Sequence, residues 1–139
     1  MGSYIENVQF ATLPKIDESI LPGESLAVVG WGLTEIGSTS PILLMTRMIK
    51  ISLEECKQIH PKWLVSKNMF CAIGEYSTTC QGDSGSGIYL IDDHNEELGA
   101  LVGLVSWGDE RCSVKPPKPG GFVDLTNFFI RDWLSILLV

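Results

Sequence analysis

Residues 80–85 read Cys-Gln-Gly-Asp-Ser-Gly, and this stretch predicts a tight turn that presents a serine hydroxyl. Gly82 lets the backbone approach a reacting carbonyl closely, and the N–H groups of Gly82 and Ser84 can form an oxyanion hole. Ser84 would be a nucleophile if a general base lay within hydrogen-bond reach. The alternative is a glycine-rich turn with an incidental serine, and the segment alone leaves both open.

Short apolar segments separated by turn residues lie on both sides of this turn. The chain has 14 Gly and 7 Pro in 139 residues, which is typical of strands joined by frequent turns. We expect strands over residues 26–29, 48–51, 69–72, 100–107 and 121–125. Residues 88–91 should form a hairpin with the segment from Leu98 onward. Its acidic tip lacks the spacing of a calcium loop, so we expect a solvated loop and an all-β domain.

Two helices are predicted. Ser52 and Glu55 fit a capping box before a helix over residues 53–60, which Pro61 ends. A second helix is expected over residues 127–138. One face of it carries apolar side chains at helical spacing, and we expect this face to dock on the core. These side chains are Phe129, Trp133, Ile136 and Leu137.

Composition excludes several function classes. The net charge of −7, from 10 Lys+Arg and 17 Asp+Glu, disfavours a nucleic-acid or anionic-membrane binder. The apolar runs are all shorter than the roughly 18 residues of a membrane span. The N-terminus has neither the basic nor the apolar region of a secretory signal. We interpret residues 1–7 as a start segment or tag remnant and residues 8–139 as one domain.

The four cysteines indicate disulfides rather than a metal site. No pair has C-x-x-C spacing and the chain has only two histidines, so we expect no metal and no cofactor. Two disulfides would fit an oxidising compartment, and three connectivities are possible.

Other motifs follow in a fixed order along the chain. Gly-Trp-Gly stands at residues 30–32, Ser-Trp-Gly at 106–108 and Lys-Pro-Gly at 118–120. With residues 80–85, this order resembles the trypsin/chymotrypsin family of serine endopeptidases, over nearly the whole chain from about Val8. The resemblance implies an all-β fold, a six-stranded antiparallel Greek-key β-barrel with a C-terminal α-helix. In such peptidases this is the second of two barrels, so the N-terminal barrel is missing from this chain.

The resemblance also implies which cysteines pair. The expected disulfides are Cys56–Cys71 and Cys80–Cys112. A third disulfide usual in this half of the family would join the positions of Leu26 and Leu90. Because both are leucine here, an apolar pair should fill that space.

Site roles follow from the same resemblance. Asp83 matches a buried aspartate that pairs with an N-terminal amine released by zymogen cleavage. Thr78 matches the floor of the substrate pocket and is uncharged, so a basic preference is not supported. Gly108 and Gly120 match the pocket walls and leave it open, which favours an apolar or medium-sized side chain. Arg111, near the rim, is expected to be a solvated charge.

The Ser106–Gly108 stretch, with Trp107 at its centre, would pair with the substrate backbone as an added strand. Polypeptide substrates, the N-terminal barrel and a protease inhibitor are therefore the partners that the resemblance implies.

A general base is missing from the sequence. The family takes its histidine and the aspartate that orients it from the first barrel. His60 and His94 match no such motif, and we expect both at the surface.

We therefore favour the C-terminal half of an extracellular serine endopeptidase, inactive by itself. The alternatives are a non-catalytic binding or regulatory module and an unrelated β-domain.

Overall fold

The computed structural model describes residues 8–15, 18–62, 65–92, 94, 97–112 and 115–138. The expected start segment, residues 1–7, and part of the acidic hairpin tip lie outside these residues. The described elements are, in chain order, β1 (Ser25–Gly30), β2 (Leu44–Ile51), α1 (Leu53–Ile59), β3 (Met69–Gly74), β4 (Gly87–Ile91), β5 (Leu98–Trp107), β6 (Gly120–Asp124) and α2 (Phe128–Leu137).

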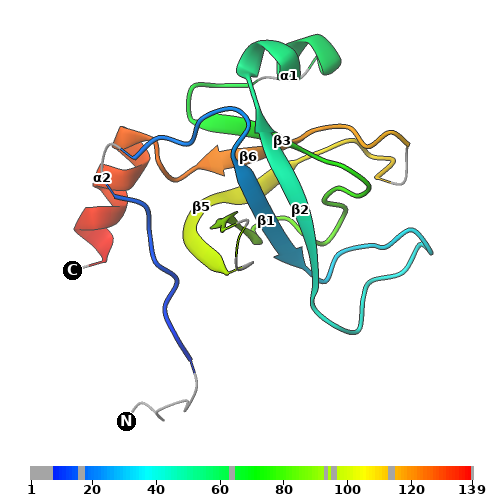
Figure 1. Ribbon diagram of the computed structural model, residues 1–139, viewed down its shortest axis with the longest axis horizontal. Helices are drawn as coiled ribbons and strands as arrows, with labels where there is room; N and C mark the ends of the chain where they lie inside the picture. Colours follow the sequence, from blue (N-terminus) through cyan, green and yellow to red (C-terminus); the bar gives the residue numbers. More distant parts are fainter. Residues whose placement is uncertain are drawn as a thin grey trace.

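The strands form a closed antiparallel barrel in the order β1-β2-β3-β6-β5-β4 (Figure 1). Pairing of β1 with β4 closes it and sets Leu26 opposite Leu90, so the expected apolar pair does form across this seam. The predicted all-β barrel with a terminal helix is confirmed. β2 begins at Leu44, earlier than expected, because residues 44–47 continue the ladder with β1 although their side chains are mostly exposed.

Alternate side chains from the strands fill the barrel interior. Phe70 of β3 and Phe122 of β6 stack with ring centroids 5.3 Å apart, and both are buried. Gly103 of β5 makes room for them, because a Cβ there would lie 2.7 Å from the Phe70 ring. Aliphatic side chains surround the two rings, namely Leu26, Val28, Met48, Ile88 and Val102. The interior is thus filled by the strands themselves.

Helix α1 is capped and fastened as its sequence predicts. The Ser52 Oγ accepts a hydrogen bond from Glu55 N at 3.1 Å, and His60 is the C-cap residue. Cys56, in the middle of the helix, is fully buried and forms a disulfide with Cys71 of β3. This link fixes α1 to the barrel wall.

The expectation that α2 docks its apolar face on the core is wrong. Phe129, Trp133, Ile136 and Leu137 are 58–76% exposed. The periodic pattern predicts an amphipathic helix but not what covers it, and the strands already fill this barrel.

The N-terminal segment runs past α2 (Figure 1). Arg131 Nε donates to Pro14 O at 2.9 Å, and Leu101 N of β5 donates to Thr12 O at 2.7 Å. Val8 and Phe10, in the same segment, are exposed as well.

Within the described part of the chain, neither helix is long and apolar enough to cross a membrane.

Candidate functional site

Residues 80–85 form a turn of the predicted kind. Gly82 and Gly85 have φ of +95° and +83°, a left-handed conformation that glycine adopts readily. Asp83 N donates to Cys80 O at 3.0 Å within the turn, and Gly85 N donates to Val105 O at 2.9 Å. The second bond attaches the turn to β5 and leaves Ser84 exposed.

The carboxylate of Asp83 is bound between the Gly-Trp-Gly motif and the turn itself. One oxygen accepts from Gly32 N at 2.8 Å and the other from Cys80 N at 2.9 Å. A Cβ at Gly30 would lie 2.0 Å from this carboxylate, and one at Gly32 would lie 2.5 Å from it. Both glycines are therefore required by the space that the carboxylate occupies.

A large cavity of about 730 Å³ adjoins the Asp83 carboxylate. Asp83 and Gly32 line it together with apolar side chains of β1 and β2, including Val28 and Met45. The Asp83 carboxylate thus faces a recess of mixed lining, in which apolar residues of β1 and β2 lie beside polar and charged residues such as Glu35 and Arg111.

A second, smaller pocket of about 120 Å³ includes Ser84 in its wall. It brings together the expected residues Ser106, Trp107 and Gly108. Thr79 also lines it, and a Cβ on Gly120 would lie 3.2 Å from the Thr79 hydroxyl.

Thr78 lies outside this small pocket. It lines the larger cavity, and its hydroxyl donates to Lys118 O at 3.4 Å. Thr79, which sequence reasoning did not single out, lies beside Gly120 as well, and the role of Thr78 as the pocket floor stays a prediction.

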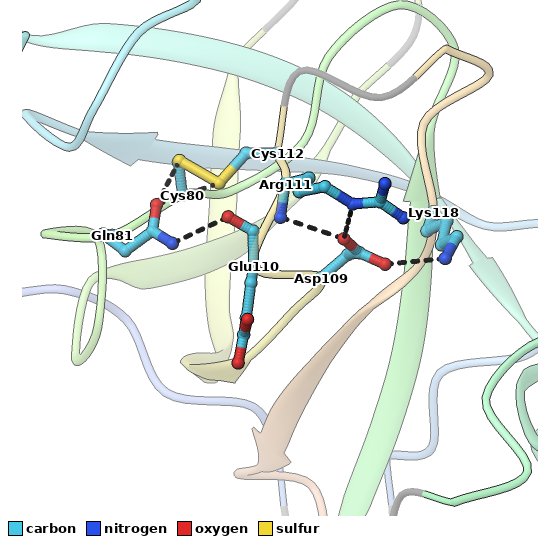
Figure 2. Close-up of polar contacts among 7 residues, drawn as sticks. All are labelled: Cys80, Gln81, Asp109, Glu110, Arg111, Cys112 and Lys118. Carbon is cyan, nitrogen blue, oxygen red and sulfur yellow. Dashed lines mark hydrogen bonds and ion pairs between the residues drawn. A yellow bond between two sulfur atoms is a disulfide. The ribbon is translucent and has the colours of Figure 1, made fainter. Parts of the chain in front are cut away.

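Polar contacts brace the rim of the small pocket (Figure 2). The Cys80–Cys112 disulfide joins the Ser84 turn to the loop after β5. Gln81 Nε2 donates to Glu110 O at 2.9 Å across the same gap. Both expected disulfides are thus present.

Asp109 carries the ion pairs of this rim. Lys118 Nζ donates to its carboxylate at 2.7 Å, and Arg111 Nε lies 3.9 Å away (Figure 2). The Lys118 hydrogen bond, followed by that from the Arg111 backbone, lowers the pKa of Asp109. Arg111 is an exposed rim charge, as expected, although Asp109 partly neutralises it.

The two histidines behave differently from each other. His94 is exposed, as expected, but His60 is not a surface residue: it is 5% exposed. Its Nε2 lies 3.1 Å from Pro119 O. His60 is the C-cap residue of α1, and its backbone N–H donates to Cys56 O at 2.9 Å.

Among the residues that the structure describes, no hydrogen bond reaches the Ser84 hydroxyl from an imidazole, and no group of three or more His, Cys, Asp or Glu side chains could hold a metal ion.

Comparison with known proteins finds serine proteases by sequence and by structure. The family model described as Trypsin matches residues 2–134. Mouse transmembrane protease serine 11C is 31% identical over 95% of this chain, and human transmembrane protease serine 11B is 29% identical over 96%. The solved structure of neuropsin, a serine protease expressed in the limbic system of mouse brain, superposes with a TM-score of 0.76 at 26% identity.

The chain spans only part of these proteins. It covers 30% of the mouse relative, 32% of the human one and 55% of the neuropsin chain.

The close approach of the Asp83 carboxylate to Gly32 predicts that Gly32→Ala destabilises the domain. The added methyl group must displace a carboxylate that two backbone N–H groups hold, so we expect a loss of about 1–3 kcal/mol in the free energy of unfolding by urea. Gly99→Ala is the matched control, because a Cβ there meets only ordinary contacts, and it should change stability by at most about 0.5 kcal/mol. Equal losses in the free energy of unfolding for the two substitutions would contradict this role of Gly32.

The Asp109–Lys118 pair predicts a pH-dependent contribution to stability. Because the pKa of Asp109 is lowered on folding, this contribution is complete above the ordinary carboxyl pKa of about 4 and is lost as the pH falls through the lowered value. The free energy of unfolding of the wild type should exceed that of Asp109→Asn by at most about 1 kcal/mol near pH 7. This difference should disappear in acid. Lys118→Met should cause the same loss, and the double variant should lose little more. A gap that persisted at pH 2 would count against this pair.

Proposed function

This chain belongs to the trypsin family, and we propose that it is the second barrel of a two-barrel serine endopeptidase with Ser84 as its nucleophile. One observation carries the proposal. Ser84 stands on a glycine turn beside a small pocket, and the adjacent Asp83 is held by two backbone N–H groups. A turn of this kind presets the N–H groups that catalysis by acyl transfer requires.

The proposed reaction is hydrolysis of a peptide bond through an acyl-enzyme. The Ser84 Oγ attacks the carbonyl carbon while its proton passes to a general base, which returns it to the leaving amine as the C–N bond breaks. The N–H groups of Gly82 and Ser84 stabilise the oxyanion. Water then hydrolyses the ester and restores the serine.

The base must come from outside the described residues. His60 is engaged with Pro119 and His94 is in the β4–β5 hairpin, so we assign neither to the reaction. We propose that the histidine and its aspartate belong to an N-terminal barrel outside residues 1–139. The length comparison supports this, since the chain covers about a third of its curated relatives.

Asp83 is the proposed link to zymogen activation. Its carboxylate borders a recess of about 730 Å³, one wall of which is formed by apolar residues of β1 and β2. A new N-terminus entering that recess would bring an ammonium group to the carboxylate and an apolar side chain to the walls. The ion pair would then fix the turn that carries Gly82 and Ser84.

The substrate pocket is uncharged beside Thr79 in this proposal, and its acidic lining residues are Asp109, which is paired with Lys118, and Glu110. Gly108 and Gly120 leave space beside the Thr79 hydroxyl, so an apolar or medium-sized substrate side chain is accommodated. The exposed Ser106 leads an edge that can pair with the substrate backbone. Polypeptide substrates, and inhibitors that imitate them, are the partners this pocket fits.

We further propose an extracellular location. The two disulfides persist in oxidising surroundings, and the relatives named above are called transmembrane proteases. The alternative function, a non-catalytic binding or regulatory module, is favoured by the missing imidazole at Ser84.

Reactivity towards a fluorophosphonate probe tests the role of Ser84. We expect the chain alone to show no labelling above Ser84→Ala, because no base deprotonates the hydroxyl. A coding sequence upstream of Met1 with a family-type Ala-Ala-His-Cys segment should, when joined to this chain and cleaved to release the activating N-terminus, produce strong labelling at Ser84. Strong labelling of the isolated chain would contradict our assignment of the base, and none in the joined form would favour the binding module.

The exposed face of α2 gives a second test. If an N-terminal barrel normally covers it, the isolated chain should associate as its concentration rises, because apolar side chains remain in water. Phe129→Lys with Ile136→Glu should shift light-scattering masses towards the monomer. Gln9→Lys with Gln58→Glu introduces the same charges at exposed polar sites and should change nothing. A wild-type chain that stayed monomeric at high concentration would argue against a covered face.

A further inference from the structure

The two disulfides differ in how far they are withdrawn from water. Cys56 and Cys71, which link α1 to β3, are fully buried. Cys80 and Cys112 are only half-buried, and they belong to segments without regular secondary structure (Figure 2). Thiol–disulfide exchange requires a thiolate to reach a sulfur atom, so Cys80–Cys112 is the disulfide that a reductant in solution can attack.

Cys80–Cys112 is also part of a wall that two cavities share. Both cysteines line the recess of about 730 Å³ at Asp83, and both line the pocket of about 120 Å³ at Ser84. The backbone N–H of Cys80 is in addition one of the two donors that hold the Asp83 carboxylate. Cleavage of the S–S bond therefore frees one side of each cavity at once.

The Gln81 side chain lies against both sulfur atoms. Its Oε1 is 2.8 Å from Cys80 Sγ and 3.2 Å from Cys112 Sγ (Figure 2). A disulfide has no S–H group, so the oxidised sulfurs donate nothing to this oxygen. A thiol carries a donor, and either cysteine gains a hydrogen bond to Oε1 after reduction. The amide therefore stabilises the reduced form relative to the oxidised form.

We propose that Cys80–Cys112 is a redox switch for the Ser84 site. A dithiol reductant attacks one sulfur as a thiolate, forms a mixed disulfide and leaves as its own cyclic disulfide. The reductant loses two electrons, the S–S bond breaks, and two protons pass to the sulfurs of Cys80 and Cys112. Cys56–Cys71 stays oxidised. The proposal rests on the proposed function only for the use of the site.

Reduction should release the pocket rim without unfolding the barrel. The Ser84 turn stays attached to β5 through Gly85 N, which donates to Val105 O. Polar contacts such as that of Gln81 with Glu110 still join the rim to the turn, but each contributes little at an exposed position. The reduced chain therefore keeps its barrel and gains a mobile pocket rim.

Differential alkylation tests the selectivity. The chain is equilibrated in mixtures of reduced and oxidised dithiothreitol, and free thiols are trapped with iodoacetamide and mapped by mass spectrometry. We expect Cys80 and Cys112 to be half alkylated at a ratio of reduced to oxidised dithiothreitol about 10-fold lower or more than Cys56 and Cys71 require. Both disulfides opening at the same ratio would overturn the proposal.

Substitution of Gln81 tests the role of its amide. Gln81→Leu should raise the ratio needed for Cys80–Cys112 by about threefold or more, because the reduced thiols lose their acceptor. Gln58→Leu makes the same change at an exposed position on α1 and should leave the ratio unchanged. A Gln81→Leu chain that is no harder to reduce than wild type would refute this role.

Hydrogen exchange tests the effect on the site. In the selectively reduced chain we expect the amides of residues 82–85 and 107–112 to exchange about 10-fold faster or more, with β1–β2 amides unchanged. Cys80→Ser with Cys112→Ser should show this fast exchange without reductant and should not respond to it further.

Exchange that rises in all strands would overturn the proposal, as would reduction of Cys80–Cys112 with unchanged exchange at the rim. None of these measurements requires catalysis. Failure of Ser84 to react therefore tests the proposed function, and the response to dithiothreitol tests the switch.

Discussion

The Asp83 carboxylate is the constraint on which the candidate site depends. It joins two segments about fifty residues apart, since one oxygen binds the backbone after β1 and the other binds the start of its own turn. An ionised group can leave water at tolerable cost only when its oxygens find donors. The glycines at 30 and 32 supply the space for this arrangement, so the position of Ser84 follows from the location of a single carboxylate.

The pocket walls are secured differently, by cross-links between loops. The Cys80–Cys112 bond and the Gln81 amide each connect two loops around the small pocket, and the Asp109–Lys118 pair joins the two ends of the connection between β5 and β6. The polar contacts contribute modestly one by one, but together with the disulfide they restrict segments that have no regular secondary structure.

Much of this fold can be predicted from sequence because the barrel obeys local rules. Alternation and turn residues locate the strands, Ser52 marks the start of α1, and the motif order indicates the family and with it the cysteine pairing. The errors arise where a long-range contact decides the outcome. The apolar stripe of α2 indicates an amphipathic helix without naming what covers it. His60 is buried by Trp107 and Pro119, both distant in sequence.

Closure of the barrel between β1 and β4 also governs how rapidly the chain folds. The residues that pair across this seam, such as Val28 and Ile88, are separated by about sixty residues. The pairing of β3 with β6 likewise joins segments far apart in the sequence. The entropy of closing such loops is lost before the ladder is gained, so domains of this topology fold in roughly milliseconds to seconds rather than microseconds. During that interval unpaired strand edges are open to other chains. The Cys56–Cys71 bond closes a segment only fifteen residues long, so the entropy lost in closing it is smaller than that of the β1–β4 seam.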